Sequence, residues 1–239
     1  MVAKTSGTTS FNLDLNDLVE EAFERCGAEL RSGYDLKTAR RSLNLLLMDW
    51  ANRGINLWTI EQGSQVLTPG TATYNLPSDT VDLIEHVVRT GSGQNQVDIN
   101  ISRISISTYS TIPNKNAVGR PIQIRIDRKT GATSATGVEQ NPQFTVWPVP
   151  DTSNTYTLIY WRLRRMQDAG NGINGQDVPF RLIPALVAGL AYYLSMKIPN
   201  AADRMQALKA QYDEAWDLAA TEDREKAPVR FVPRNTFYR

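Results

Sequence analysis

The stretch from Asp35 to Trp58 carries the clearest structural signal in the sequence. Apolar residues recur in it at three- and four-residue steps, which is the pattern of a helix with one buried face. The residues of this stripe are Leu36, Ala39, Leu43, Leu46, Leu47 and Trp50. We predict Asp35 as the N-cap, because its carboxylate can accept from the free N–H groups of the first turn. We predict Gly54 as the C-cap, because glycine adopts the left-handed conformation without steric cost.

Helical patterns flank a long region of strand-like alternation. Further helices are expected at 12–29, 179–198 and 201–223. Between the helical ends, β-branched and aromatic residues alternate with polar ones, which indicates strands. The expected strands are near 58–68, 71–76, 82–90, 97–102, 121–127, 143–148 and 155–165, with a short helix near 107–112. The pattern predicts an α+β fold, in which both ends of the chain build a four-helix bundle around an inserted antiparallel β domain, a sandwich or small barrel.

Four segments follow from this pattern. The first helical pair occupies 1–57, the β domain 58–170, the second helical pair 171–226, and an extended C-terminal tail 227–239. From Lys226 onward every charged side chain is basic, and two prolines disfavour a helix. Such a tail is either a disordered end or a docking segment. Its aromatic and arginine residues favour docking, because these are common anchors of protein interfaces.

Composition excludes several classes of protein. The 239 residues have a formal net charge of +1, so no overall electrostatic attraction draws the chain to nucleic acid or to anionic membranes. A single cysteine, Cys26, excludes an internal disulfide framework and a cysteine-rich zinc site. The most apolar stretch, 183–194, is shorter than the roughly 20 residues that span a bilayer, and no signal peptide is evident. We therefore expect folding in a cytoplasm and no membrane partner.

A literal G-x-G-x-x-G occurs at 170–175. Dinucleotide binding requires a parallel βαβ unit and an acidic residue about 20 positions further on. Ser195 occupies that position, and the strand before the glycines fits an antiparallel meander. A flexible linker is therefore the preferred interpretation, and no cofactor is expected.

Candidate catalytic groups are few. His86 is the only histidine and lies in an expected strand, without a nucleophile-elbow sequence or a second histidine for a metal. A structural role is the preferred interpretation for His86, as is a small core residue for Cys26. A carboxylate pair suited to glycoside hydrolysis stays open, because 25 acidic residues can assemble one in many ways. We predict no catalytic or metal-binding residues and no enzyme.

Three arginines cluster on one expected strand, at Arg162, Arg164 and Arg165. They form either a solvated edge or an intersubunit salt bridge. The alternative is a basic lining that faces nucleic acid and gives salt-dependent, non-specific contact. Salt bridging or solvation is the preferred interpretation, and a channel or interface role stays open.

Four sequence blocks, taken in order, resemble the head-to-tail adaptor proteins of tailed bacteriophages, most closely those of short-tailed phages. The blocks are TARRSLNLLLMDWANRGINLWTIEQ, LTPGTATYNLPSDTVDLIEHVVR, IPNKNAVGRPIQIRIDR and FTVWPVPDTSNTYTLIYWRLRRMQD. The resemblance runs from about residue 11 to residue 198. It implies a structural virion protein, also called head completion or tail tubular protein A, and not an enzyme.

The resemblance also implies partners. About twelve copies of such an adaptor form a ring beneath the portal protein, extend the channel through which double-stranded DNA passes, and present a platform to the tail nozzle or tail tube protein. The implied location is the neck of a virion assembled in the bacterial host cytoplasm. The family's tail role, docking on the portal, would belong to Arg230, Phe231, Arg234, Phe237 and Tyr238. Off-stripe residues of the 35–58 helix become candidate subunit contacts: Arg40, Arg41, Asn44 and Asn52.

Other functions compete with this interpretation. The chain can be another ring of the same neck, such as a stopper or nozzle protein, and portal binding would separate the two. A cell-wall hydrolase would require a cleft with two facing carboxylates. A DNA-binding module would show strong, salt-dependent affinity for DNA as an isolated monomer.

Overall fold

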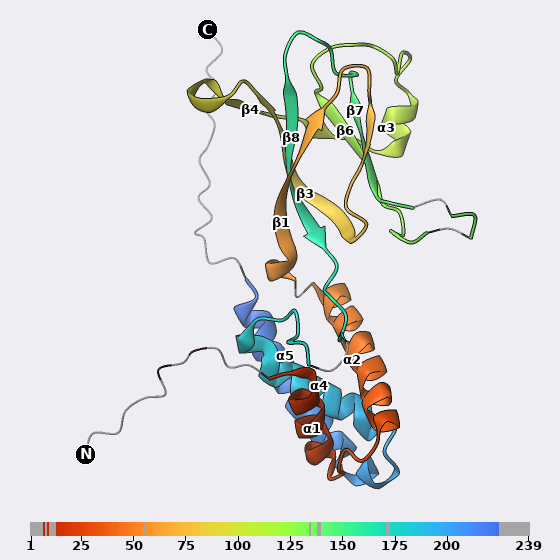
Figure 1. Cartoon of the computed structure of the whole chain (residues 1–239), viewed down its shortest axis with the longest axis vertical. Helices are drawn as coiled ribbons and strands as arrows, with labels where there is room; N and C mark the ends of the chain where they lie inside the picture. Colours follow the sequence, from red (N-terminus) through yellow and green to blue (C-terminus); the bar gives the residue numbers. More distant parts are fainter. Residues whose placement is uncertain are drawn as a thin grey trace. The chain divides into compact units, whose positions relative to one another are not determined.

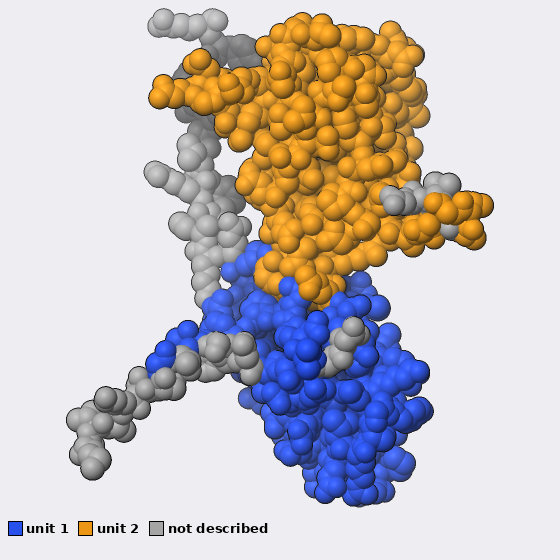
Figure 2. Space-filling view, in the orientation of Figure 1, with its two compact units in different colours: residues 1–57, 168–239 blue, residues 58–167 orange. Residues whose placement is uncertain are grey.

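The computed structural model describes residues 7, 9, 13–54, 56–133, 135–137, 140–170 and 173–224. Within these ranges the chain forms five α-helices and two four-stranded sheets, which confirms the α+β class (Figure 1). The chain divides into two compact units (Figure 2). Unit 1 combines residues 1–57 with 168–239, and unit 2 contains residues 58–167. The expected tail, 227–239, lies outside the described residues and stays a prediction.

Helix α1 spans Leu15–Cys26, and Asp14 caps its start by accepting a hydrogen bond from the backbone N–H of Asp17 (2.9 Å). Helix α2 spans Gly33–Arg53. The predicted N-cap of α2 is wrong, because Ser32 holds that position. Ser32 Oγ accepts from the N–H of Asp35 (3.3 Å), and Asp35 Oδ2 accepts from the N–H of Ser32 (3.1 Å). This is a capping box, in which Asp35 lies inside the first turn.

The C-cap prediction for α2 is confirmed. Gly54 has φ 86° and ends the helix in the left-handed conformation. A short 3-10 helix, Leu57–Thr59, follows.

Helix α4 (Ile183–Ser195) is largely buried and packs against α1, α2 and α5 (Met205–Glu222). The 3-10 segments Phe180–Leu182 and Pro199–Arg204 precede α4 and α5. At Gly189 an added Cβ would lie 2.8 Å from Tyr212 Cε2 and 2.9 Å from Leu46 Cδ2. The missing side chain therefore lets α2 and α5 approach α4 closely. All four long helices lie in unit 1, and their arrangement as a regular bundle stays a prediction.

The two sheets of unit 2 have the strand orders β1-β8-β3-β4 and β2-β7-β6-β5. The strands are β1 (Ile60–Leu67), β2 (Thr73–Asn75), β3 (Thr80–Thr90), β4 (Val97–Asn100), β5 (Ser102–Arg103), β6 (Gln123–Asp127), β7 (Gln143–Trp147) and β8 (Tyr156–Arg164). Another short 3-10 helix, Gly93–Asn95, lies between β3 and β4.

The prediction of a purely antiparallel domain is wrong at one edge, where β5 pairs with β6 in parallel. Only Ile101 separates β4 from β5, so the chain continues directly from the first sheet into the second. Helix α3 (Ile106–Ser110) then lies in the crossover to β6. A crossover of this kind is what two parallel neighbours require.

Buried side chains from both sheets of unit 2 form one core, as in sheets packed face to face. The first sheet contributes Leu67, Leu83, Val88, Tyr156, Leu158 and Tyr160, and the second Ile124, Phe144 and Val146. This core is separate from the helical core of unit 1, so each unit has the apolar interior that an independent fold needs.

Candidate assembly surfaces

The outer side of α2 contains two of the four candidate subunit contacts. Arg41 and Asn52 are exposed there, whereas Arg40 is half-buried. Asn44 is used inside the chain, because its Oδ1 accepts a hydrogen bond from the N–H of Ala169 (2.9 Å). The residues between them that the sequence analysis missed are Leu45 and Met48, which are 55% and 61% exposed.

We name this exposed face the α2 stripe. Its members are Tyr34, Lys37, Arg41, Leu45, Met48 and Asn52. They recur at steps of three or four residues, so they lie on one side of the helix. The buried residues Leu43, Leu46 and Trp50 lie on the other side. The sequence already shows apolar residues on two faces of this helix, and the second apolar face could have been recognised as a possible contact surface.

A groove runs along α4 on unit 1. Two adjoining hollows of about 390 and 460 Å³ share Arg25 and Pro184. Helix α4 lines both hollows, and α1 and α5 provide the walls. The α1 wall consists of Asp17, Glu20, Glu21, Glu24 and Arg25, and the α5 wall of Gln211, Glu214, Ala215 and Leu218. We name this feature the α4 groove.

The α4 groove is acidic and partly apolar. Glu21 is neutralised by Arg25, whose Nε lies 2.8 Å from Glu21 Oε1. Within the described ranges, the acids Asp17, Glu24 and Glu214 have no ion-pair partner, and neither does Glu20. Exposed carboxylates beside apolar side chains suit a partner that has both cationic and apolar groups.

The arginine cluster of β8 is held by ion pairs within the chain. Arg162 contacts Glu61 (Nη2 to Oε2, 2.8 Å) and Asp79 (Nη1 to Oδ1, 2.5 Å), and its side chain is 12% exposed. Arg164 Nε also contacts Glu61 (Oε1, 2.6 Å). Arg165 is exposed and donates to the carbonyl of Thr130. These ion pairs lie within one chain, which the sequence analysis did not foresee. An intersubunit salt bridge and a channel or interface role for the cluster stay predictions.

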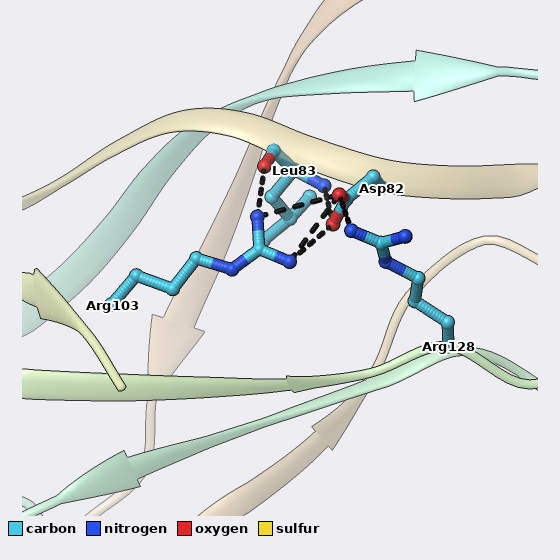
Figure 3. Close-up of polar contacts among 4 residues, drawn as sticks. All are labelled: Asp82, Leu83, Arg103 and Arg128. Atoms are coloured by element: carbon cyan, nitrogen blue, oxygen red, sulfur yellow. Dashed lines mark hydrogen bonds and ion pairs between the residues drawn. The ribbon is translucent and has the colours of Figure 1, made fainter. Parts of the chain in front are cut away.

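A second charged cluster, which the sequence analysis missed, joins the two sheets of unit 2 (Figure 3). Asp82 of β3 accepts hydrogen bonds from Arg103 of β5 (Nη2 to Oδ1, 2.9 Å) and from Arg128, which follows β6. Arg103 Nη1 also donates to the carbonyl of Leu83 (3.1 Å). One carboxylate on the first sheet therefore anchors two cations of the second.

Two titratable groups are shifted by burial. Burial lowers the pKa of His86 below its usual range, and neither ring nitrogen has a hydrogen-bond partner among the residues that the structure describes. Burial raises the pKa of the Cys26 thiol to about 11, and its Sγ lies 3.2 Å from the carbonyl oxygen of Ala191. A neutral imidazole and a protonated thiol at neutral pH match the structural roles predicted for both residues.

The glycine-rich segment follows a strand with antiparallel neighbours on both sides, β1 and β3. The carbonyl of Asn174 accepts from the N–H of Leu15 (3.2 Å), so this segment borders the start of α1. The next helical turn begins only at Phe180. This topology disagrees with the βαβ unit that a dinucleotide site needs and agrees with a linker.

Within the described part of the chain, no three His, Cys, Asp or Glu side chains are grouped so as to hold a metal ion. The helices of those same ranges include none that is both long and apolar enough to cross a membrane.

A family model described as SU10 adaptor protein matches residues 13–232, which include both units. The chain belongs to the SU10 adaptor protein family. No curated protein matches the chain. Membership confirms the resemblance to phage head-to-tail adaptors and places this adaptor among the structural proteins of bacteriophages.

The family match covers only some of the residues expected to dock on the portal. Arg230 and Phe231 lie within the matched range of the adaptor, whereas Arg234, Phe237 and Tyr238 follow it. All five lie outside the described residues. Their docking role stays a prediction.

Proposed function

We propose that this adaptor forms a ring of about twelve copies beneath the portal protein, at the neck of the virion. The ring extends the DNA channel and provides the platform on which the tail nozzle or tail tube protein assembles. The single observation that carries this proposal is the adaptor-family match over residues 13–232. Assembly would take place in the host cytoplasm before the virion is complete.

The surface chemistry of the chain supports a structural role in which DNA moves past. The net charge of +1 gives no overall attraction to a polyanion. Arg162 and Arg164 are paired with carboxylates inside unit 2, so they do not present free charge to a phosphate backbone. Weak DNA affinity suits a channel through which DNA has to slide, and it argues against a DNA-binding module.

The deciding experiment is electron microscopy of the full-length adaptor mixed with portal rings of its phage. We expect a ring of adaptor density on the narrow end of the portal. A protein that binds only preassembled portal–adaptor complexes would instead be a stopper or nozzle protein. Absence of binding to either assembly would reject the proposal.

A truncation tests the portal-docking tail separately. Removal of residues 227–239 should weaken capture by immobilised portal rings, because the aromatic and arginine anchors are lost. The circular dichroism spectrum and thermal unfolding of the truncated protein should match those of the full chain. Unchanged capture would reject docking by the tail while leaving the ring proposal intact.

A further inference from the structure

A closed ring of identical copies requires two different surfaces on each copy, because every contact is head to tail. We propose that the α2 stripe of one copy docks in the α4 groove of the next. This inference rests on the ring of the proposed function, and it identifies the two surfaces that would close it. The partner is a second copy of this chain.

The convex side of the proposed contact is the α2 stripe. Tyr34, Leu45 and Met48 are 71%, 55% and 61% exposed. Large apolar side chains that line up along one helix are more than scattered surface residues, and such a face commonly marks a protein contact. Next to them Lys37 and Arg41 are exposed and have no ion-pair partner among the described residues.

The concave side is the α4 groove. Its α1 wall presents the carboxylates of Asp17, Glu20 and Glu24, which have no ion-pair partner in the part of the chain that the structure describes. Its α5 wall adds Glu214 and the side chain of Leu218, which is 67% exposed. The groove therefore offers acids to Lys37 and Arg41 and apolar surface to Leu45 and Met48. Opposite charges around an apolar centre are the usual composition of a specific interface.

The two surfaces lie on different sides of unit 1, as head-to-tail contacts require. Pro184 and Ala188 of α4 line the groove, whereas Gly189 contacts Leu46 on the inner face of α2. At 100° per residue, Pro184 and Gly189 point roughly 140° apart around α4. The α2 stripe is the outer face of that neighbouring helix. A copy can therefore use its groove and its stripe at the same time.

Another segment of the chain also has the right charge for the groove. The C-terminal residues Lys226, Arg230, Arg234 and Arg239 are basic and accompany aromatic side chains. The stripe is favoured because its exposed apolar residues, Tyr34, Leu45 and Met48, need a partner of their own. The test separates these two occupants.

The test uses charge reversal with rescue, in full-length protein assembled on portal rings and counted by electron microscopy and native mass spectrometry. Lys37→Glu with Arg41→Glu, and separately Glu20→Lys with Glu24→Lys, should each reduce complete rings at least tenfold. The four changes together should restore rings, because the opposite charges face each other again. Leu45→Glu with Met48→Glu should also prevent ring closure, and no charge change can rescue it.

A matched control changes one exposed residue of unit 2, which carries neither surface. Ile106→Glu in α3 replaces an apolar side chain that is 68% exposed and should leave rings complete. All variants are exposed substitutions, so unchanged thermal unfolding confirms that each one is folded.

Each remaining outcome rejects the inference in a recognisable way. Complete rings from the Leu45→Glu, Met48→Glu protein would show that the stripe is not at the interface. If the groove variant loses rings while the stripe variants keep them, the groove has another occupant, such as the basic tail. The same conclusion follows if the four changes together do not restore rings. If the wild-type protein forms no ring on the portal, the proposed function itself fails.

Discussion

The two units use their charged residues in opposite ways. In unit 2, Asp82 and Glu61 each anchor two arginines, so the charges join strands and sheets of the same chain. In unit 1, the helices pack closely around Gly189. Four acids of the α4 groove, Asp17, Glu20, Glu24 and Glu214, and the two cations of the α2 stripe have no ion-pair partner among the described residues.

This difference separates charges that stabilise a fold from charges that are available for assembly. An ion pair made inside the chain is already satisfied and gains little from a partner molecule. An unpaired charge on a surface adds little to the stability of the monomer but can steer and select a partner. Unit 1 is therefore the better place to look for contacts between copies.

The largest expected effect is on the packing of unit 1. Gly189→Val should lower the free energy of unfolding by about 3 kcal/mol, because its side chain would overlap Tyr212 and Leu46. Urea unfolding followed by tryptophan fluorescence measures the change. Gly33→Ala, at a helix position with open space around it, should change stability by less than about 1 kcal/mol. Equal stability of the two variants would show that α4 does not need a glycine.

The next effect concerns the link between the sheets of unit 2. Asp82→Ala leaves Arg103 and Arg128 without their shared acceptor and should cost about 2 kcal/mol. Asp98→Ala removes the exposed pair with Arg89 on a single sheet and should have the smaller effect. Chemical unfolding of both proteins at low and high salt provides the comparison. If Asp82→Ala is the milder of the two, the cluster does not stabilise the sandwich.

A matched pair of arginines tests the comparison directly. Arg162→Gln should lower stability by about 1–2 kcal/mol, because Glu61 and Asp79 lose charge-assisted hydrogen bonds. Arg41→Gln should change the stability of the monomer by less than about 0.5 kcal/mol. Ring assembly should show the opposite ranking: Arg41→Gln should reduce the number of complete rings more than Arg162→Gln does. A destabilising Arg41→Gln would place that charge inside the fold and not at an assembly surface.

The smallest effect is the pH dependence that comes from His86. Its folded-state pKa is lowered, so below about pH 6.5 the unfolded chain binds the proton more readily and stability falls as the pH decreases. Nearby charges also act on the pKa of His86: Glu85 and Asp82 raise it, and Arg103 lowers it. Thermal unfolding between pH 7.5 and 5.5 should show a shallower decrease for His86→Gln than for the wild type. Parallel profiles would exclude His86 as the source.

Local patterns predicted the elements well because local physics produces them. The apolar stripe of α2, the strands β3 and β8, and the glycine at Gly54 were all readable from spacing and residue type. The N-cap was misassigned although Ser32 and Asp35 have the three-residue spacing of a capping box.

Contacts between distant segments could not be predicted. Arg162 meets Glu61 and Asp79 across 101 and 83 residues of sequence, and nothing local marks either carboxylate as its partner. The same holds for the parallel edge at β5, which depends on where β4 ends. The α4 groove needs three helices to be placed before its acids become one surface. Leu45 and Met48 were the exception, because their position off the buried stripe was visible in the sequence.

The first and last strands of unit 2 are hydrogen-bonded neighbours. Ile60 of β1 pairs with Leu163 of β8, and the register continues without interruption to Leu67 and Tyr156. The two points at which the chain enters and leaves the β unit are therefore close together, which is the condition under which a domain can be inserted or replaced. During evolution, or by design, the β unit can be exchanged as a cassette while the helices that precede and follow it keep their connections.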